Sequence, residues 1–142
     1  TIIGEGEQYE ELMYTIHLLG LTNHVFLAGR KTPSEVKALL ASSEIYIQYS
    51  ISEGFCNAVL EAQAMGLLCI VSDAEGLTEN VLHEKTGWVV PKRNPDKLAH
   101  KIMEVVNLGA EEKASVIMNA QTRVLKDFNL EKQQQEFLKF YE

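Results

Sequence analysis

The chain has 142 residues, of which 46% are hydrophobic and 23% charged, the balance of a globular protein large enough to bury a core. It carries 20 acidic and 13 basic residues, a net charge of −7, and shows no basic patch or stripe, which argues against a nucleic-acid binder. Its longest apolar run, residues 64–71, is too short to cross a bilayer.

Five short runs of aliphatic, aromatic and β-branched residues predict strands. Most of them lack alternation between apolar and polar residues, which is typical of strands buried on both faces. In chain order they are Thr1–Ile3, Val25–Gly29, Glu44–Tyr49, Leu67–Ser72 and Gly87–Val90.

Helical patterns lie between and after these runs. The second of them opens with TPSE, in which Thr32 is a predicted cap, Pro33 takes the first helical position and Glu35 reaches back to the cap. The predicted helices are Glu7–Leu19, a helix from Pro33, Asn57–Met65, Asp96–Val106, Glu111–Lys126 and one after Leu130.

Strands that alternate with helices predict a Rossmann-like, doubly wound α/β fold with a parallel sheet and helices on both faces. We expect a single domain over 1–142, with the sheet and the site in 1–91 and a helical layer in 92–142. Ligands of such sheets bind beyond the carboxyl ends of the strands.

One such end carries the sequence SEGFCNAVLEAQAMG, in which Glu53 and Glu61 are eight residues apart. The predicted helix from Asn57 offers unpaired N–H groups and a partial positive charge at its first turn, which suits a phosphate. Gly54 would allow the backbone to approach the ligand closely. Ionised glutamates accept hydrogen bonds from hydroxyl groups, so a sugar nucleotide fits this pattern.

Spacing alone leaves a plainer interpretation open. An amphipathic helix with one exposed glutamate is ordinary, and a Ser-Glu-Gly turn before a helix is common. On that interpretation both glutamates are solvated surface residues.

Several ordered motifs resemble one family. The chain contains EGFCNAVLEAQAMG, then LLCIVSD ending at Asp73, then AEGLTE, and then KTGWVVP ending at Pro91. These segments are similar to the signature of retaining glycosyltransferases with the GT-B fold, of the family 4 (glycosyl transferases group 1) type, in their C-terminal, donor-binding domain. The resemblance covers most of the chain.

The resemblance implies transfer of a sugar from a nucleotide-sugar donor to an acceptor hydroxyl, with retained configuration and without a metal ion or other cofactor. It implies that Glu61 binds the ribose hydroxyls and that Glu53 lies beside the transferred sugar, as the candidate catalytic residue. The other implied donor-binding residues are Gly54, Phe55 and Cys56 for the sugar, Asn57 and Ala58 for the pyrophosphate, and Gly29, Arg30 and Lys31 near the base.

Two departures from the family pattern stand out. Cys56 replaces a usual glycine, which places a thiol near the donor sugar. The basic pair that neutralises the pyrophosphate in the family comes from a segment upstream of TIIG.

The chain begins abruptly, so we expect a piece of a longer protein that lacks the first strand and helix of this domain and is inactive alone. The expected partners are a nucleotide-sugar donor and an N-terminal acceptor-binding domain, through which family members often attach to membranes. An open sheet edge favours self-association of the piece.

Cys56 and Cys69 form neither a metal pattern nor a disulfide framework. With no charged and apolar leader, this favours a cytoplasmic protein.

Two other classes stay open. A sugar-nucleotide epimerase shares the GT-B architecture, although the EGFxxxxxEA form argues against it. A non-catalytic α/β interaction module is the second. A receiver-type module would want an aspartate after the third strand, where this chain has Ser50 and Ile51.

Overall fold

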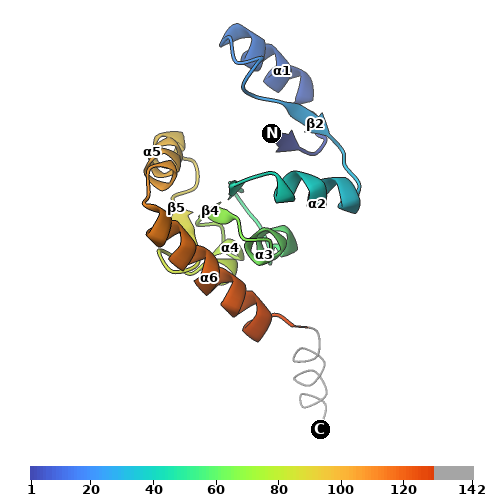
Figure 1. The fold of residues 1–142 in the computed structure, drawn as a ribbon. Coiled ribbons are helices and arrows are strands. Elements are labelled where there is room, and N and C mark those ends of the chain that lie inside the picture. The colour runs from blue at the N-terminus through green and yellow to red at the C-terminus, as the bar shows by residue number, and fades with distance from the viewer. Residues whose placement is uncertain (130–142) are drawn as a thin grey trace. The chain divides into compact units, whose positions relative to one another are not determined.

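The computed structural model describes residues 1–129 of the chain. Contacts between residues divide the chain into two compact units, Thr1–Ala41 and Ser42–Glu142. In Figure 1 the colour of the ribbon runs from blue at the N-terminus to red, so the elements of both units can be followed in chain order. The expectation of one domain over 1–142 stays a prediction.

The first unit alternates strands and helices as predicted. Its elements are β1 (Ile2–Ile3), α1 (Tyr9–Leu18), β2 (Leu27–Gly29) and α2 (Pro33–Ala41). The strands β1 and β2 pair in parallel. The prediction that strands are buried on both faces is wrong for β1, because Ile2 and Ile3 are 46% and 40% exposed in this two-stranded sheet.

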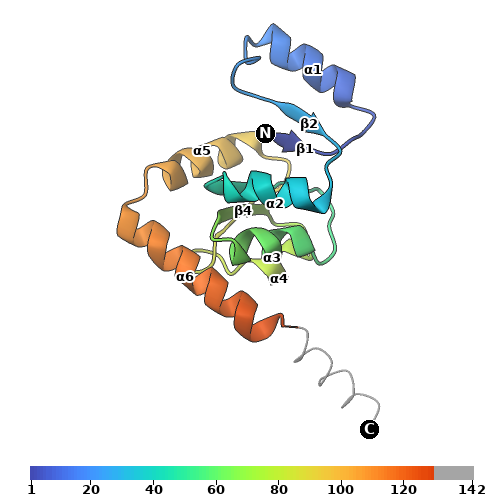
Figure 2. The same cartoon turned by 45° about the vertical axis from the view of Figure 1, so that its right-hand side comes forward.

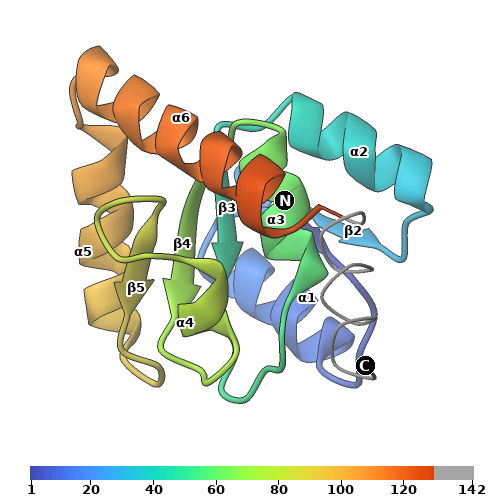
Figure 3. The ribbon, with the colours of Figure 1, turned by 90° about the horizontal axis from the view of Figure 1, so that it is seen from below.

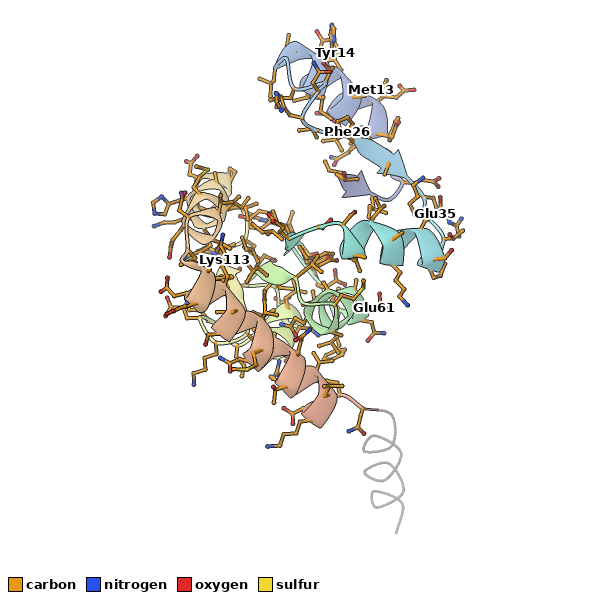
Figure 4. All side chains as sticks on the ribbon, viewed as in Figure 1. Met13, Tyr14, Phe26, Glu35, Glu61 and Lys113 are labelled. Carbon is orange, nitrogen blue, oxygen red and sulfur yellow. The ribbon has the colours of Figure 1, made fainter. Side chains whose placement is uncertain are left out.

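An apolar groove lies within the first unit. Its volume is about 550 Å³, and its walls come from α1, from β2 and from the segment before β2. Figure 4 labels three of the residues that line it, Met13, Tyr14 and Phe26.

The start of α2 confirms the predicted capping box. The Thr32 N–H donates to Glu35 Oε2 at 2.8 Å, and the Glu35 N–H donates to Thr32 Oγ1 at 3.4 Å. The Thr32 N–H and the Thr32 hydroxyl both donate to Glu35 Oε2, and they lower the pKa of Glu35 because they favour its ionised form. Local sequence therefore sets where this helix begins.

The second unit is built on three parallel strands in the order β3-β4-β5. They are β3 (Ile45–Gln48), β4 (Leu68–Ser72) and β5 (Trp88–Val90), and in Figure 3 their arrows point the same way. The register places Ile70 of β4 between Ile47 of β3 and Trp88 of β5. All five residues of β4 are buried, as expected of a central strand.

Helices cover both faces of this sheet. On one face Leu68, Ile70 and Trp88 form a cluster with Val105 of α5 (Pro95–Val106), against which Ile117 of α6 (Ala110–Asp127) packs. Cys69 and Val71, whose side chains point to the opposite face, are also fully buried. The helices α3 (Asn57–Ala64) and α4 (Leu77–Asn80) contact β4, and they lie side by side in Figures 1 and 2.

The doubly wound α/β prediction is thus confirmed, with two differences in detail. The four-residue helix α4 was not predicted, because it is too short to show a period. The helix predicted after Leu130 lies outside the described residues. Within residues 1–129, no helix combines the length and the apolar character that a membrane span requires.

Candidate functional site

The predicted strand, loop and helix around the two glutamates are present in the second unit. The strand β3 ends at Gln48, the loop Ser52–Cys56 follows, and α3 begins at Asn57. Cys56 precedes α3 with an extended backbone, and no side chain caps this helix end. Its first N–H groups are therefore open to an acceptor such as a phosphate oxygen.

Glu53 is a half-buried carboxylate with two protein donors, and it is not the solvated residue of the plainer interpretation. Its Oε2 accepts from Gln48 Nε2 at 3.2 Å and from Ser50 Oγ at 3.0 Å. The Tyr46 hydroxyl in turn donates to Gln48 Oε1 at 2.7 Å. This chain of hydrogen bonds fixes the Glu53 side chain at the end of β3.

Glu61 lies on α3 and is exposed, and Figure 4 shows its side chain projecting away from the helix. Burial raises the pKa of Tyr46, and the nearby Cys56, Cys69, Glu61 and Glu53 raise it further. Tyr46 thus lies within electrostatic reach of both glutamates. The Glu53 carboxylate is thus held by protein donors, whereas the Glu61 carboxylate is exposed.

A second glycine loop, which follows β4, packs tightly against the loop Ser52–Cys56. The Gly76 N–H donates to the Glu53 carbonyl at 3.1 Å. A Cβ atom added to Gly76 would lie 2.1 Å from the Gly54 carbonyl oxygen. The sequence AEG marked this loop, but the need for glycine at position 76 comes only from the packing.

The turn after β5 reaches the same loop. The Lys92 N–H donates to Asp73 Oδ1 at 2.8 Å, and Lys92 Nζ lies 3.2 Å from Glu75 Oε1. The carboxyl ends of β3, β4 and β5 therefore carry three connected loops, as expected of a parallel sheet.

Phe55 and Cys56, which follow Gly54, contact groups from distant segments that the sequence did not indicate. The Cys56 N–H donates to Asn80 Oδ1 at 3.0 Å. The Phe55 ring lies 5.4 Å from the Phe128 ring, centroid to centroid. The Cys56 N–H thus has a protein acceptor, and the assignment of Cys56 to the sugar stays a prediction.

The three residues predicted near a base, Gly29, Arg30 and Lys31, lie in the first unit. Gly29 has a φ of +66°, which favours glycine, and its carbonyl accepts from the Gly4 N–H at 3.0 Å. Arg30 is exposed, and Lys31 Nζ lies 3.4 Å from Glu35 Oε1. Residues 1–129 contain no group of three or more acidic, histidine or cysteine side chains suited to a metal ion.

The two thiols should differ sharply in reactivity. Burial raises the pKa of Cys69 to about 12, so almost none of it is thiolate near pH 8, whereas Cys56 is partly exposed. We expect iodoacetamide at pH 8 to alkylate Cys56 in the folded chain and Cys69 only in urea, as measured by peptide mass spectrometry. A Cys56→Ala variant should show no reaction without denaturant, and equal rates at both thiols would contradict the structure.

Comparison with known sequences identifies relatives over most of the chain. The sequence model of a family described as "Glycosyl transferases group 1" matches residues 1–123. The amylovoran biosynthesis glycosyltransferase AmsK of Erwinia amylovora is 30% identical over 135 residues, which cover 91% of this chain and 33% of AmsK. An Escherichia coli UDP-Gal:α-D-GlcNAc-diphosphoundecaprenol α-1,3-galactosyltransferase is 28% identical over 134 residues, 92% of this chain and 33% of that protein.

Solved structures show the same fold. HepE of Anabaena, in complex with UDP and glucose, superposes with a TM-score of 0.88 and 25% identity, over 98% of this chain and 39% of HepE. A glycosyltransferase of Rickettsia africae gives a TM-score of 0.85 at 27% identity, over 98% of this chain and 38% of that one. The chain thus spans about a third of the length of the curated relatives it matches.

Proposed function

Because the chain belongs to the glycosyl transferases group 1 family, we propose that it is the donor-binding domain of a retaining glycosyltransferase. The whole protein would transfer a sugar from a nucleoside diphosphate sugar to an acceptor hydroxyl. The observation that carries the proposal is the pairing of an uncapped helix end at Asn57 with a fixed carboxylate at Glu53 and an exposed one at Glu61. HepE, which was solved with UDP and glucose, supports a nucleotide-sugar donor.

In this proposal the first turn of α3 binds the pyrophosphate. The N–H groups of Asn57 and Ala58 lie at the positive end of the helix, where an anion is stabilised. As the bond to the sugar breaks, negative charge grows on the leaving pyrophosphate, and preorganised N–H groups stabilise it. By the family resemblance, the basic residues that complete the neutralisation of the pyrophosphate would come from a segment of the whole protein upstream of TIIG.

The two glutamates take different roles. The exposed Glu61 accepts hydrogen bonds from the vicinal hydroxyls of the ribose, for which an ionised carboxylate is well suited. Glu53, held by Gln48 and Ser50, stands beside the sugar next to the Gly54 and Phe55 N–H groups.

The remaining features of the whole protein follow from the family resemblance. We propose that transfer needs no metal ion and that an N-terminal domain binds the acceptor and can attach to a membrane surface. We also propose a cytoplasmic location, which the two free thiols support.

The test is a titration of UDP, GDP and ADP, with and without attached sugars, followed by amide chemical shifts. Three bases are needed because the donors named for relatives differ, with UDP-Gal in one and GDP-mannose in another. We expect shifts at residues 54–58 for one base. The Glu61→Ala variant should bind that nucleotide about tenfold more weakly or worse, since a hydrogen bond to a charged group contributes about 1.5–3 kcal/mol.

The matched control is Glu111→Ala, which removes an exposed glutamate from the first turn of α6. This variant should bind like the parent chain. No shifts with any nucleotide up to millimolar concentration would contradict the proposal and favour a non-catalytic interaction module. Equal affinity of the parent chain and Glu61→Ala would remove the role given to Glu61.

A further inference from the structure

Asn80 is a buried residue whose side chain contacts the loop Ser52–Cys56. It is the last residue of α4 and is 0% exposed. Its Oδ1 accepts from the Cys56 N–H at 3.0 Å, across 24 residues of sequence. A side chain of α4 thus fixes the Phe55–Cys56 peptide, just before the start of α3.

Arg123 of α6 anchors the other side of Asn80. Its guanidinium donates to the Asn80 carbonyl and to the Glu79 carbonyl, both at 2.7 Å. These carbonyls are at the C-terminal end of α4, where they lack helical partners and a cation is favourable. The Arg123 side chain is only 17% exposed, and its hydrogen bond to the Asn80 carbonyl is partly buried, whereas the one to the Glu79 carbonyl is exposed.

The same arginine reaches the loop by a second route. Its guanidinium carbon lies 4.9 Å from the centre of the Phe128 ring, a cation–π contact. Phe128 packs against Phe55, with an angle of 44° between the rings. Arg123 therefore supports Phe55 through Phe128 and Cys56 through Asn80.

A role in stability alone explains Asn80 poorly. The Asn80 Nδ2 atom is buried without a hydrogen-bond partner among the described residues. The same holds for Oε1 of the neighbouring Gln63, although the Gln63 Nε2 donates to the Asn80 carbonyl at 3.4 Å. Burying an unpaired polar atom costs stability. An apolar side chain of similar size would avoid that cost but could not accept from Cys56.

We infer that Asn80 and Arg123 are positioning residues, which hold the backbone of the loop Ser52–Cys56 in the conformation that binds the donor. The inference rests on the proposed function. Neither residue need touch the donor, because their effect passes through the Cys56 N–H and the Phe55 ring. A loop ordered before binding loses less conformational freedom when the ligand arrives, which raises affinity.

The first test compares Asn80→Leu with the parent chain in two measurements. Hydrogen exchange of the Cys56 N–H should speed up at least tenfold in the variant, because its acceptor is gone. Affinity for the nucleotide that the parent chain binds should fall by a similar factor. Thr86→Val is the matched control. It removes another buried hydrogen-bond acceptor, the Thr86 hydroxyl, which accepts from the Leu82 N–H at 2.9 Å and not from the loop Ser52–Cys56.

The second test is Arg123→Leu, with Arg123→Lys as the conservative variant. Lysine keeps the charge and can donate to the two carbonyls, so it should restore part of the affinity that leucine loses. Lys126→Leu, on the same helix and exposed, should leave affinity unchanged. Trp88 fluorescence in urea reports how much of each variant is folded, and affinities are compared per folded molecule.

The outcomes separate the two claims. If Asn80→Leu and Arg123→Leu bind the nucleotide as tightly as Thr86→Val does, the inference is wrong while the proposed function stands. If the parent chain binds no nucleotide, the proposed function fails. Unchanged exchange at the Cys56 N–H would overturn the positioning role in that case as well.

Discussion

Replacing Gly76 with alanine should lower the free energy of unfolding of the second unit by about 3 kcal/mol, the upper part of the usual range for overpacking. The added Cβ would lie 2.1 Å from the Gly54 carbonyl oxygen and 2.7 Å from the Phe55 nitrogen. Both atoms belong to the backbone, so no side chain can rotate away. Gly76 has a φ of −74°, which alanine adopts freely, so the effect comes from the close approach alone.

The measurement is urea unfolding followed by the fluorescence of Trp88, the one tryptophan of the chain, which is buried in the second unit. Gly109→Ala is the matched control. It lies in the same unit, and the nearest atom to its added Cβ is a side-chain oxygen of Glu112 at 3.7 Å. Equal midpoints for the two variants would contradict the packing of the two loops.

The same substitution should weaken nucleotide binding beyond its effect on stability. To fit the methyl group, the loop Ser52–Cys56 must move away from Gly76, and the hydrogen bond from the Gly76 N–H to the Glu53 carbonyl is lost. We expect amide shifts of residues 53–57 to change in the folded Gly76→Ala chain and to stay in place in Gly109→Ala.

The fold could be predicted from the sequence wherever a feature depends on residues close in the chain. Apolar runs located all five strands, because strands of a parallel sheet are near-continuous runs of hydrophobic residues. The start of α2 followed from Thr32, Pro33 and Glu35 within one turn. The two glutamates could be singled out because loop and helix follow one another directly.

The supports of the site could not be predicted, because they depend on contacts between distant segments. Asn80 meets Cys56 across 24 residues, and Arg123 meets Asn80 across 43. An asparagine after a glutamate, or an arginine on a long helix, carries no local sign of such a contact. The exposure of β1 was also missed, since burial depends on which other elements cover a strand.

Replacing Ile70 with alanine should lower the free energy of unfolding by about 2–5 kcal/mol, the range for truncating a buried aliphatic residue. Ile70 is fully buried in the central strand and belongs to the cluster with Leu68, Trp88 and Val105. Both its neighbouring strands are held in register, so the cavity cannot close by a simple shift of one element.

Ile47→Ala is the matched control for this prediction. Ile47 lies on β3, where it pairs directly with Ile70 of β4, but its side chain is 41% exposed. The same atoms are removed in both variants, so a difference in the urea midpoint measures burial. We expect Ile47→Ala to cost about 1 kcal/mol or less. If the two variants were equally destabilised, β4 would not be the centre of the core, and the placement of the site loops at its carboxyl end would lose its structural basis.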